Sequence, residues 1–373
     1  MKFKNKLMKI VHITSSHPRY DIRIFHKECR SLADKGYDVT LLAADGEKDE
    51  VRDGVRIRAV NRYRNWFERL YLTPTRLFKN AIREDADIYH LHDPELLYFA
   101  YKLARKGKRV VIDLHEDTPK SILQRRWLTK FLRRAVAYVI KKLEDAASRN
   151  AAGVICVLPY VADRLARFNQ NIIILNNFPI LEEFKTEPQE KNNQISYTGI
   201  ITRERGIKNI VQAMSDVEGV QFNLAGEFKD KRLHKELKKT DGWSRTNYLG
   251  YLERDQMSKV LSSSIAGILL FLPYSFQKSA LPNKLFEYMA AKIPVICSDF
   301  PHWKKIIDEN KCGLTVDPNN VREISEAMNY IRNNKDEAMK MGEDGRKAVE
   351  QKYNWKNEKE KLLSLYKEIY SKE

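Results

Sequence analysis

The chain has 373 residues, of which 43% are hydrophobic and 31% charged, and its formal net charge is +17. This length exceeds what one hydrophobic core usually serves, so two domains are expected, and the composition is typical of a soluble globular protein. The excess of positive charge predicts an anionic partner: nucleic acid, an anionic membrane surface or phosphorylated small molecules. No stretch reaches the roughly 18 uninterrupted apolar residues of a transmembrane helix, and no signal peptide is recognisable. Neither secretion nor membrane spanning is therefore expected.

The cysteines indicate the cellular compartment. The chain has four, which are scattered without a CxxC pair or metal-ligand spacing: Cys29, Cys156, Cys297 and Cys312. We expect them to be reduced core residues of a cytoplasmic protein.

The first half of the chain alternates predicted strands and helices. Apolar, β-prone runs predict strands at residues 8–14, 37–43, 55–60, 88–92, 109–115, 153–158 and 172–176. Helical periodicity predicts helices between them: one ending at Ala33, then residues 66–83, 94–105, 123–147 and 160–168. This order is typical of a parallel sheet covered by helices on both faces.

The same order restarts in the second half. Strands are expected at residues 195–198, 221–225, 247–251, 266–271, 295–298 and 314–316, and the tail from residue 322 is expected to be helical. Prolines and mixed charge interrupt the pattern beforehand, which predicts a linker at residues 181–193. The fold class is therefore α/β, with two doubly wound domains at residues 1–180 and 194–354. Ligands are expected at the carboxyl ends of strands, in the cleft between the domains.

One corner of the second domain is suited to a phosphate. Leu281, Pro282 and Asn283 predict a turn, and a helix is expected from Lys284 to residue 291. The N-terminus of that helix would offer free N–H groups, and Lys284 adds a positive charge. Glu287 lies on an otherwise apolar helix face and needs a partner. That partner is either a pair of sugar hydroxyls or an ion pair or solvent at the surface.

Polar loops follow two strands of the first domain. His115 follows the strand at residues 109–115, where α/β enzymes place their chemistry, while the adjacent Asp117 or Thr118 would cap the next helix. His90 and His92 share one side of a strand, but no third ligand lies at a metal-binding spacing, so no metal is expected. Instead, His92 and Asp93 are expected to cap the next helix and to line the cleft.

A further loop follows the first strand of the second domain. Gly199 to Gly206 precede a helix, and Arg205 lies at its N-terminus, where its charge opposes the helix dipole unless an anion is present. Anion binding is one interpretation of Arg205. An ion pair with Glu204 at the surface is the other.

Six segments occur in this order along the chain: SSHPRYDIRIFHKECRSLADKGYDV, HDPELL, VVIDLHED, YTGIITRERGI, PNKLFEYMAAKIPVICSDFP and CGLTVDP. In the order and spacing of these segments, the chain resembles glycosyltransferase family 4, whose members have the GT-B fold. The resemblance covers nearly the whole length. It implies two Rossmann-like domains, with the final helix (355–373) crossing back onto the first. It also implies a nucleotide-sugar donor held by the second domain, an acceptor bound by the first, retention of anomeric configuration and no metal or other cofactor.

The resemblance also implies roles for individual residues. Lys284 and Arg205 match the cations at the donor diphosphate, Glu287 matches the glutamate at the donor ribose, and His115 matches the catalytic histidine against the transferred sugar. Tyr251 and Leu252 match the region of the nucleobase. The remaining positions expected in the donor loop and at its sugar are Gly199, Ser279, Leu281, Pro282 and Asn283. Those expected in the acceptor site or cleft are Arg19, Asp21, His92, Asp93 and Glu116.

The chain departs from the family pattern at several positions. Ser279 stands where the family has a glutamate that contacts the donor sugar, and Ile200 stands where an arginine is usual. The glycine-rich first loop is replaced by residues 17–21. These departures leave the donor sugar open.

Basic and aromatic residues are concentrated in residues 120–149 and 66–71 of the first domain. An amphipathic basic helix suits an anionic membrane surface, although most such helices dock on their own sheet.

The hypothesis is a cytoplasmic glycosyltransferase, peripheral at the inner face of the plasma membrane, that extends a lipid-linked glycan in polysaccharide or glycolipid synthesis. A nucleotide-sugar 2-epimerase and a non-catalytic sugar-nucleotide-binding subunit are the alternatives. Nucleic acid is not expected, because no nucleic-acid-binding motif is present.

Overall fold

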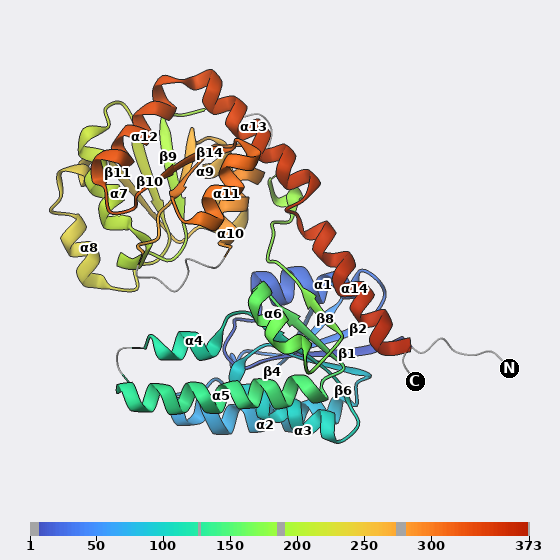
Figure 1. Cartoon of the computed structure of the whole chain (residues 1–373). Helices are drawn as coiled ribbons and strands as arrows, with labels where there is room; N and C mark the ends of the chain where they lie inside the picture. The colour runs from blue at the N-terminus through green and yellow to red at the C-terminus, as the bar shows by residue number, and fades with distance from the viewer. Residues whose placement is uncertain (1–6, 126–127, 185–190, 274–280, 372–373) are drawn as a thin grey trace. The chain divides into compact units, whose positions relative to one another are not determined.

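The computed structural model describes residues 7–125, 128–184, 191–273 and 281–371. The chain divides into two compact units, drawn in Figure 1. The first comprises residues 1–177 and 356–373, and the second comprises residues 178–355. All four cysteines are buried and free, as predicted.

The first unit is built on an eight-stranded sheet. Its strands, in sheet order, are β3 (Glu50–Arg52), β4 (Val55–Ala59), β2 (Asp38–Ala43), β1 (Lys9–Thr14), β5 (Ile88–Leu91), β6 (Arg109–Leu114), β7 (Gly153–Cys156) and β8 (Ile172–Ile174). All neighbours are parallel except β3 and β4, which are antiparallel. The register places His12 of β1 opposite His90 of β5. Seven of these strands were predicted.

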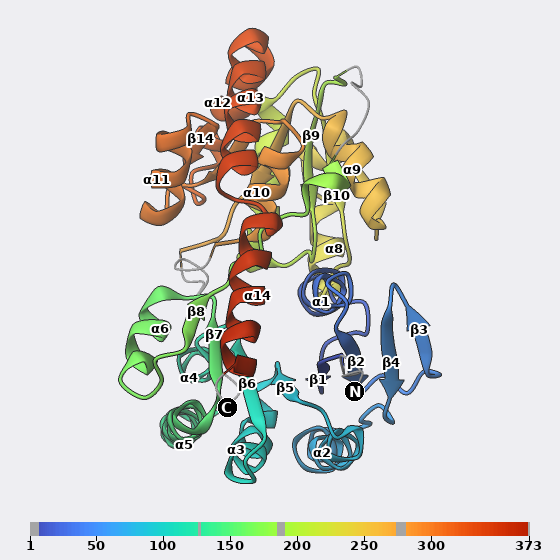
Figure 2. The ribbon, with the colours of Figure 1, turned by 90° about the vertical axis from the view of Figure 1, so that its right-hand side faces the viewer.

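Helices cover both faces of this sheet, which confirms the predicted layering. Figures 1 and 2 show α2, α3 and α5 on one face and α1 and α14 on the other. The helical segments of the unit are η1 (Ile22–Cys29), α1 (Arg30–Ala33), η2 (Glu68–Leu72), α2 (Thr73–Glu84), η3 (Pro94–Leu96), α3 (Leu97–Arg105), α4 (Thr118–Leu123), α5 (Lys130–Asn150), α6 (Pro159–Ala166) and α14 (Trp355–Ser371). Trp355 itself belongs to the second unit.

The prediction of one helix over residues 123–147 is wrong. Helix α4 ends at Leu123, and α5 begins at Lys130. The hydroxyl of Thr129 accepts a hydrogen bond from the backbone N–H of Leu132 at 3.4 Å, which satisfies one of the free donors at the start of α5. Asp117 caps α4 in the same way, by accepting from the N–H of Lys120 at 3.0 Å.

The second unit is built on a six-stranded parallel sheet, and all six strands were predicted. In sheet order they are β11 (Thr246–Gly250), β10 (Gln221–Ala225), β9 (Gln194–Thr198), β12 (Ala266–Leu269), β13 (Val295–Ser298) and β14 (Gly313–Val316). Its helical segments are η4 (Leu181–Phe184), η5 (Arg203–Arg205), α7 (Ile207–Ala213), η6 (Met214–Asp216), α8 (Lys231–Leu237), η7 (Asp241–Arg245), α9 (Arg254–Ser262), α10 (Asn283–Ala290), α11 (Pro301–Asn310), α12 (Val321–Asn333) and α13 (Lys335–Gln351).

Close packing fixes α10 on this sheet. A Cβ atom on Gly267 of β12 would lie 2.3 Å from the ring of Tyr288, so only glycine admits the helix at this distance. Apolar side chains of α10 fill the core beneath it. The N-terminus of α10 is thereby placed beside the loop that follows β9. In the part of the chain that the structure describes, no helix is long and apolar enough to cross a membrane.

Candidate functional site

Two predicted cations meet at the carboxyl end of β9. The ammonium group of Lys284 lies 5.9 Å from the ring centre of Tyr197, and Nη1 of Arg205 lies 3.4 Å from the hydroxyl of the same tyrosine. Lys284 extends over Gly199, where a Cβ atom would lie 2.3 Å from Cε of the lysine. No ion pair joins Arg205 to Glu204, both of which the structure describes. The interpretation of Arg205 as a surface ion pair with Glu204 is therefore wrong.

Lys284 is an unusual lysine. Burial lowers its pKa from 10.5 to about 8, and the positive charges of Arg205 and Arg254 act in the same direction, while Glu287 opposes them. The ammonium group is thus held among cations in a poorly solvated place. Such a group gains more from a bound anion than an exposed lysine does, because the anion replaces missing solvent and relieves the repulsion.

Glu287 has a protein partner that the sequence did not reveal. Its Oε1 accepts a hydrogen bond from Nη1 of Arg254 at 2.7 Å, and Arg254 also pairs with Glu183. Glu287 is thus ion-paired, as one alternative held, but it is 7% exposed rather than at the surface. The ion pair orients the carboxylate, which as an acceptor suits hydroxyl donors.

The other residues predicted at the donor lie at the same end of the sheet or outside the described residues. Gly199 has φ +132° and its carbonyl fills the space where Gly226 would carry a Cβ, so the backbones approach closely there. Tyr251 is 66% exposed directly after β11. Leu252 and Leu281 are partly buried, Pro282 precedes α10, and Asn283 is its first residue. Ser279 lies outside the described residues.

In the first unit, His115 follows β6 and contacts Asp113 on the same strand. Nε2 of His115 lies 3.0 Å from Oδ2 of Asp113. Arg23 donates to both carboxylate oxygens of Asp113, at 3.0 and 2.9 Å. Burial alone would raise the pKa of Asp113, but Arg23 and His115 bring it well below its usual range. Asp113 is therefore an ionised carboxylate inside the protein.

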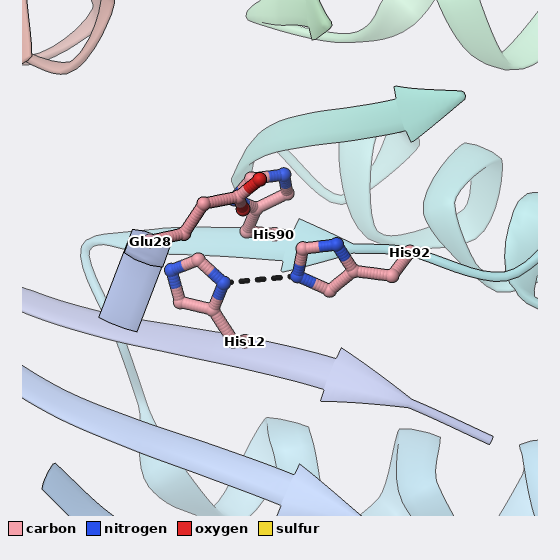
Figure 3. Close-up of side chains that lie close together, drawn as sticks. All are labelled: His12, Glu28, His90 and His92. Atoms are coloured by element: carbon pink, nitrogen blue, oxygen red, sulfur yellow. Dashed lines mark hydrogen bonds and ion pairs between the residues drawn. The ribbon is translucent and has the colours of Figure 1, made fainter. Parts of the chain in front are cut away.

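A chain of buried side chains leads from His115 into the unit. Nδ1 of His92 lies 3.4 Å from Nε2 of His115, and Nε2 of His92 lies 2.9 Å from Nδ1 of His12 (Figure 3). The hydroxyl of Tyr366 on α14 lies 3.4 Å from Nε2 of His12 and 2.8 Å from Nδ1 of His90. Burial is the main cause that lowers the pKa of His92 to about 4 and those of His12 and His90 well below 6.5. These imidazoles are neutral at physiological pH.

A metal ion would be the other use of such a cluster, and sequence spacing missed two of its members. His12, Glu28, His90 and His92 each offer a ligand atom within 4.8 Å of the others (Figure 3). Imidazole binds a metal through a lone pair in the plane of its ring. The rings of His90 and His92 are stacked, with centres 4.3 Å apart and planes 30° apart, and Nε2 of His92 is already engaged with Nδ1 of His12 at 2.9 Å. The geometry favours a hydrogen-bonded cluster.

Asp93 does not act as the predicted side-chain cap. It occupies the N-cap position of η3, but its carboxylate makes no capping hydrogen bond. It accepts instead from the hydroxyl of Thr14 and the N–H of Ser15, both at 2.7 Å, and from the hydroxyl of Ser16, and it pairs with His17 at 3.0 Å. Burial alone would raise the pKa of Asp93, but these contacts, His17 first, lower it far below its usual range. The carboxylate thus orders the loop after β1.

The remaining predicted acceptor residues differ in how accessible they are. Arg19 is 9% exposed and pairs with Asp45 and Glu50, and the Oδ1 of Asp21 accepts from the N–H groups of Arg23 and Ile24 at the start of η1. Both therefore make structural contacts within the first unit. Glu116 is partly exposed beside His115.

The comparisons with known proteins identify the family. The profile described as "Glycosyltransferase Family 4" matches residues 23–178, and that described as "Glycosyl transferases group 1" matches residues 180–348. Together they cover most of both units. The chain belongs to glycosyltransferase family 4 and has the GT-B fold, as the sequence motifs predicted.

Individual relatives are distant. An uncharacterized glycosyltransferase of Methanocaldococcus jannaschii is 23% identical over 60% of this chain and 61% of its own length, so the match spans about three fifths of that relative. An alpha-D-kanosaminyltransferase of Streptomyces kanamyceticus is 21% identical over 73% of this chain and 74% of its own. Among solved structures, a sucrose-phosphate synthase from Thermosynechococcus elongatus has a TM-score of 0.75 at 16% identity, covering 98% of this chain and 100% of the other. Anabaena HepE with UDP-glucose has a TM-score of 0.74 at 14% identity, covering 96% and 99%.

Proposed function

We propose that this glycosyltransferase moves a sugar, with retention of configuration, from a nucleotide-diphosphate sugar to a lipid-linked glycan in cell-surface polysaccharide or glycolipid synthesis. The observation that carries the proposal is the pair Lys284 and Arg205, two cations that converge on Tyr197 at the carboxyl end of β9. A nucleoside diphosphate is the leaving group that such a pair would stabilise. Anabaena HepE, a structural neighbour, was solved with UDP and with UDP-glucose.

The chemistry follows from where charge develops. As the glycosidic bond breaks, negative charge accumulates on the diphosphate, and fixed cations with the N-terminus of α10 stabilise that charge more than they stabilise the intact donor. Arg254 holds Glu287 where it would accept hydrogen bonds from ribose hydroxyls. His115 of the first unit would lie against the transferred sugar. We propose that no metal ion takes part, because these groups already supply the positive charge that a metal would bring.

The lipid-linked acceptor is supported by the surface of α5. Phe131 is 84% exposed and Val139 is 54% exposed, so the apolar stripe of this helix is not all docked on its own sheet as the alternative interpretation required. Lys130, Arg134 and Lys141 are exposed on the same helix. Each basic residue close to an anionic membrane contributes about 1 kcal/mol to binding. We propose that this helix, and the exposed Trp66 outside it, contact the inner face of the plasma membrane.

Calorimetry on the full chain tests the donor. UDP-, GDP-, ADP- and dTDP-sugars are titrated, and one nucleotide class is expected to bind. Arg205→Gln should weaken that binding by about tenfold or more, since a hydrogen bond to a charged group contributes about 1.5–3 kcal/mol. Arg232→Gln is the matched control, because Arg232 is exposed on α8. The proposal fails if none of these nucleotides binds, or if both variants bind as the unmodified chain does.

A further inference from the structure

The surroundings of His115 decide which of its two nitrogens carries the proton. Nε2 faces Oδ2 of Asp113 at 3.0 Å, and Arg23 donates a hydrogen bond to each oxygen of that carboxylate. An ionised carboxylate can only accept hydrogen bonds. In the neutral imidazole the proton is therefore on Nε2, and Nδ1 carries a lone pair.

The chain of histidines behind His115 leads to the same assignment. Its protons can be arranged in two directions once donation from Nδ1 of His92 to Nε2 of His115 is excluded, because that donation would leave a lone pair of His115 facing the carboxylate of Asp113 at 3.0 Å. In one, Nδ1 of His92 donates to Asp113, 3.4 Å away, and Nε2 of His92 accepts from His12. In the other, Nε2 of His92 donates to His12, and Nδ1 of His92 accepts from Nε2 of His115 at 3.4 Å. Both directions leave the proton of His115 on Nε2.

Nδ1 of His115 is the open end of this network. The side chain is 20% exposed, whereas those of Asp113 and His92 have no exposed surface. Among the residues that the structure describes, none hydrogen-bonds to Nδ1 of His115. A lone pair held in this way recognises a hydrogen-bond donor. It rejects phosphate and carboxylate oxygens, which carry no proton at neutral pH.

We propose that Asp113 is a positioning residue that holds His115 in the Nε2–H tautomer, so that Nδ1 accepts a hydrogen bond from a sugar hydroxyl of the substrate. The identity of the ligand rests on the proposed function. The tautomer does not, because every contact that sets it lies within the first unit. His92 and His12, with Tyr366 behind them, keep the carboxylate and the imidazole in place.

Nitrogen-15 NMR of the histidine side chains in the full chain tests the tautomer without any substrate. His115→Gln assigns the signals of His115 by their loss, and the exposed His302 serves as an internal reference that samples both tautomers. We expect a single Nε2–H tautomer for His115. A proton on Nδ1, or a mixture like that of His302, would overturn the proposal.

Asp113→Asn gives a second test. Its amide N–H would donate to Nε2 and move the proton of His115 to Nδ1. We expect turnover to fall at least tenfold, with UDP affinity unchanged, because the donor cations lie in the other unit; an unchanged tautomer in the folded variant would contradict the proposal. If loss of the partner of Arg23 prevents folding, the spectrum of the unmodified chain decides. Zinc bound by His92, Asp113 and His115 would also overturn it, because Nε2 of His115 would then bind the ion and carry no proton.

The experiments distinguish failure of the proposed function from failure of the positioning role of Asp113. If the Nε2–H tautomer is found but no nucleotide sugar binds, the proposed function fails and the positioning role of Asp113 stands. If a nucleotide sugar binds but the tautomer is wrong, the positioning role fails and the proposed function stands.

Discussion

Replacing Lys284 with methionine should make the unliganded protein more stable and unable to hold the donor diphosphate. Lowering the pKa of the lysine from 10.5 to about 8 means that folding disfavours its charged form. Each pKa unit corresponds to about 1.4 kcal/mol. At pH 7 the lysine is charged in both the folded and the unfolded chain, so its charge lowers the free energy of unfolding by about 3 kcal/mol. Methionine has a similar length and carries no charge, so most of this cost should disappear.

The pH dependence gives the sign of the effect. Because the folded pKa is the lower one, the unfolded chain binds more protons between about pH 8 and 10.5, and the free energy of unfolding rises with pH in that window. The advantage of Lys284→Met should therefore be full below pH 8 and should shrink towards pH 10.5. For a unit of this size, 3 kcal/mol corresponds to a rise in Tm of roughly 5–10 °C.

Thermal unfolding at pH 7 and pH 9.5, with and without UDP, measures both consequences. UDP, or whichever nucleoside diphosphate belongs to the donor class that calorimetry identifies, should raise the Tm of the unmodified chain and leave that of Lys284→Met unchanged. Lys304→Met is the control, since Lys304 is an exposed lysine on α11 and its loss should change neither value by more than about 1 °C. A lower Tm for Lys284→Met than for the unmodified chain at pH 7, or a preserved UDP shift, would refute the reasoning.

Three further outcomes are expected. Glu287→Gln should weaken binding of the nucleotide sugar about tenfold, by calorimetry, because the neutral amide accepts less strongly from hydroxyls and forms no ion pair with Arg254. Replacing Phe131 and Tyr138 together with serine should reduce flotation with vesicles rich in anionic lipid, and should leave UDP affinity unaltered. Asp93→Asn should lower the free energy of unfolding by about 2 kcal/mol or more above pH 4 in urea titrations, and the difference should shrink as the pH falls below 4, where the unfolded carboxylate takes up a proton and the native one does not.

Each of these outcomes can fail in a distinct way. Unchanged affinity in Glu287→Gln would remove that residue from the donor site. Equal flotation by the serine variant would mean that α5 is not the membrane contact. For Asp93, a difference in stability that does not shrink below pH 4 would mean that the lost contacts are steric rather than electrostatic.

The strands were predictable because buried parallel strands are short apolar runs. The second sheet was anticipated strand for strand for this reason. The missed strand, β3, has only three residues at the sheet edge, and its Glu50 and Arg52 give no apolar pattern. The boundary between α4 and α5 was missed because the apolar stripe continues across it. The one local signal there was Thr129, a good N-cap residue.

The site was half predictable. Lys284, Arg205 and His115 could be proposed as site residues because each lies where a strand ends or a helix begins, which is visible along the chain. Their partners are set by folding instead: Arg254 is 33 residues from Glu287, and Tyr366 is 276 residues from His90. Asp113 could have been predicted as the partner of His115 from the sequence, since a residue two positions before His115 points to the same side of the strand.

The C-terminal helix has a consequence for biosynthesis. Leu365 and Ile369 of α14 pack against Gly153 of β7, and Tyr366 closes the histidine cluster, yet all of the second unit is translated before them. A ribosome adding roughly 5–20 residues per second needs on the order of ten seconds or more to cross that interval. Throughout it, the nascent first unit lacks the apolar cover of α14 and the Tyr366 hydroxyl that contacts His12 and His90. Chaperones would therefore meet this half of the protein first, and a chain stopped before α14 would never complete it.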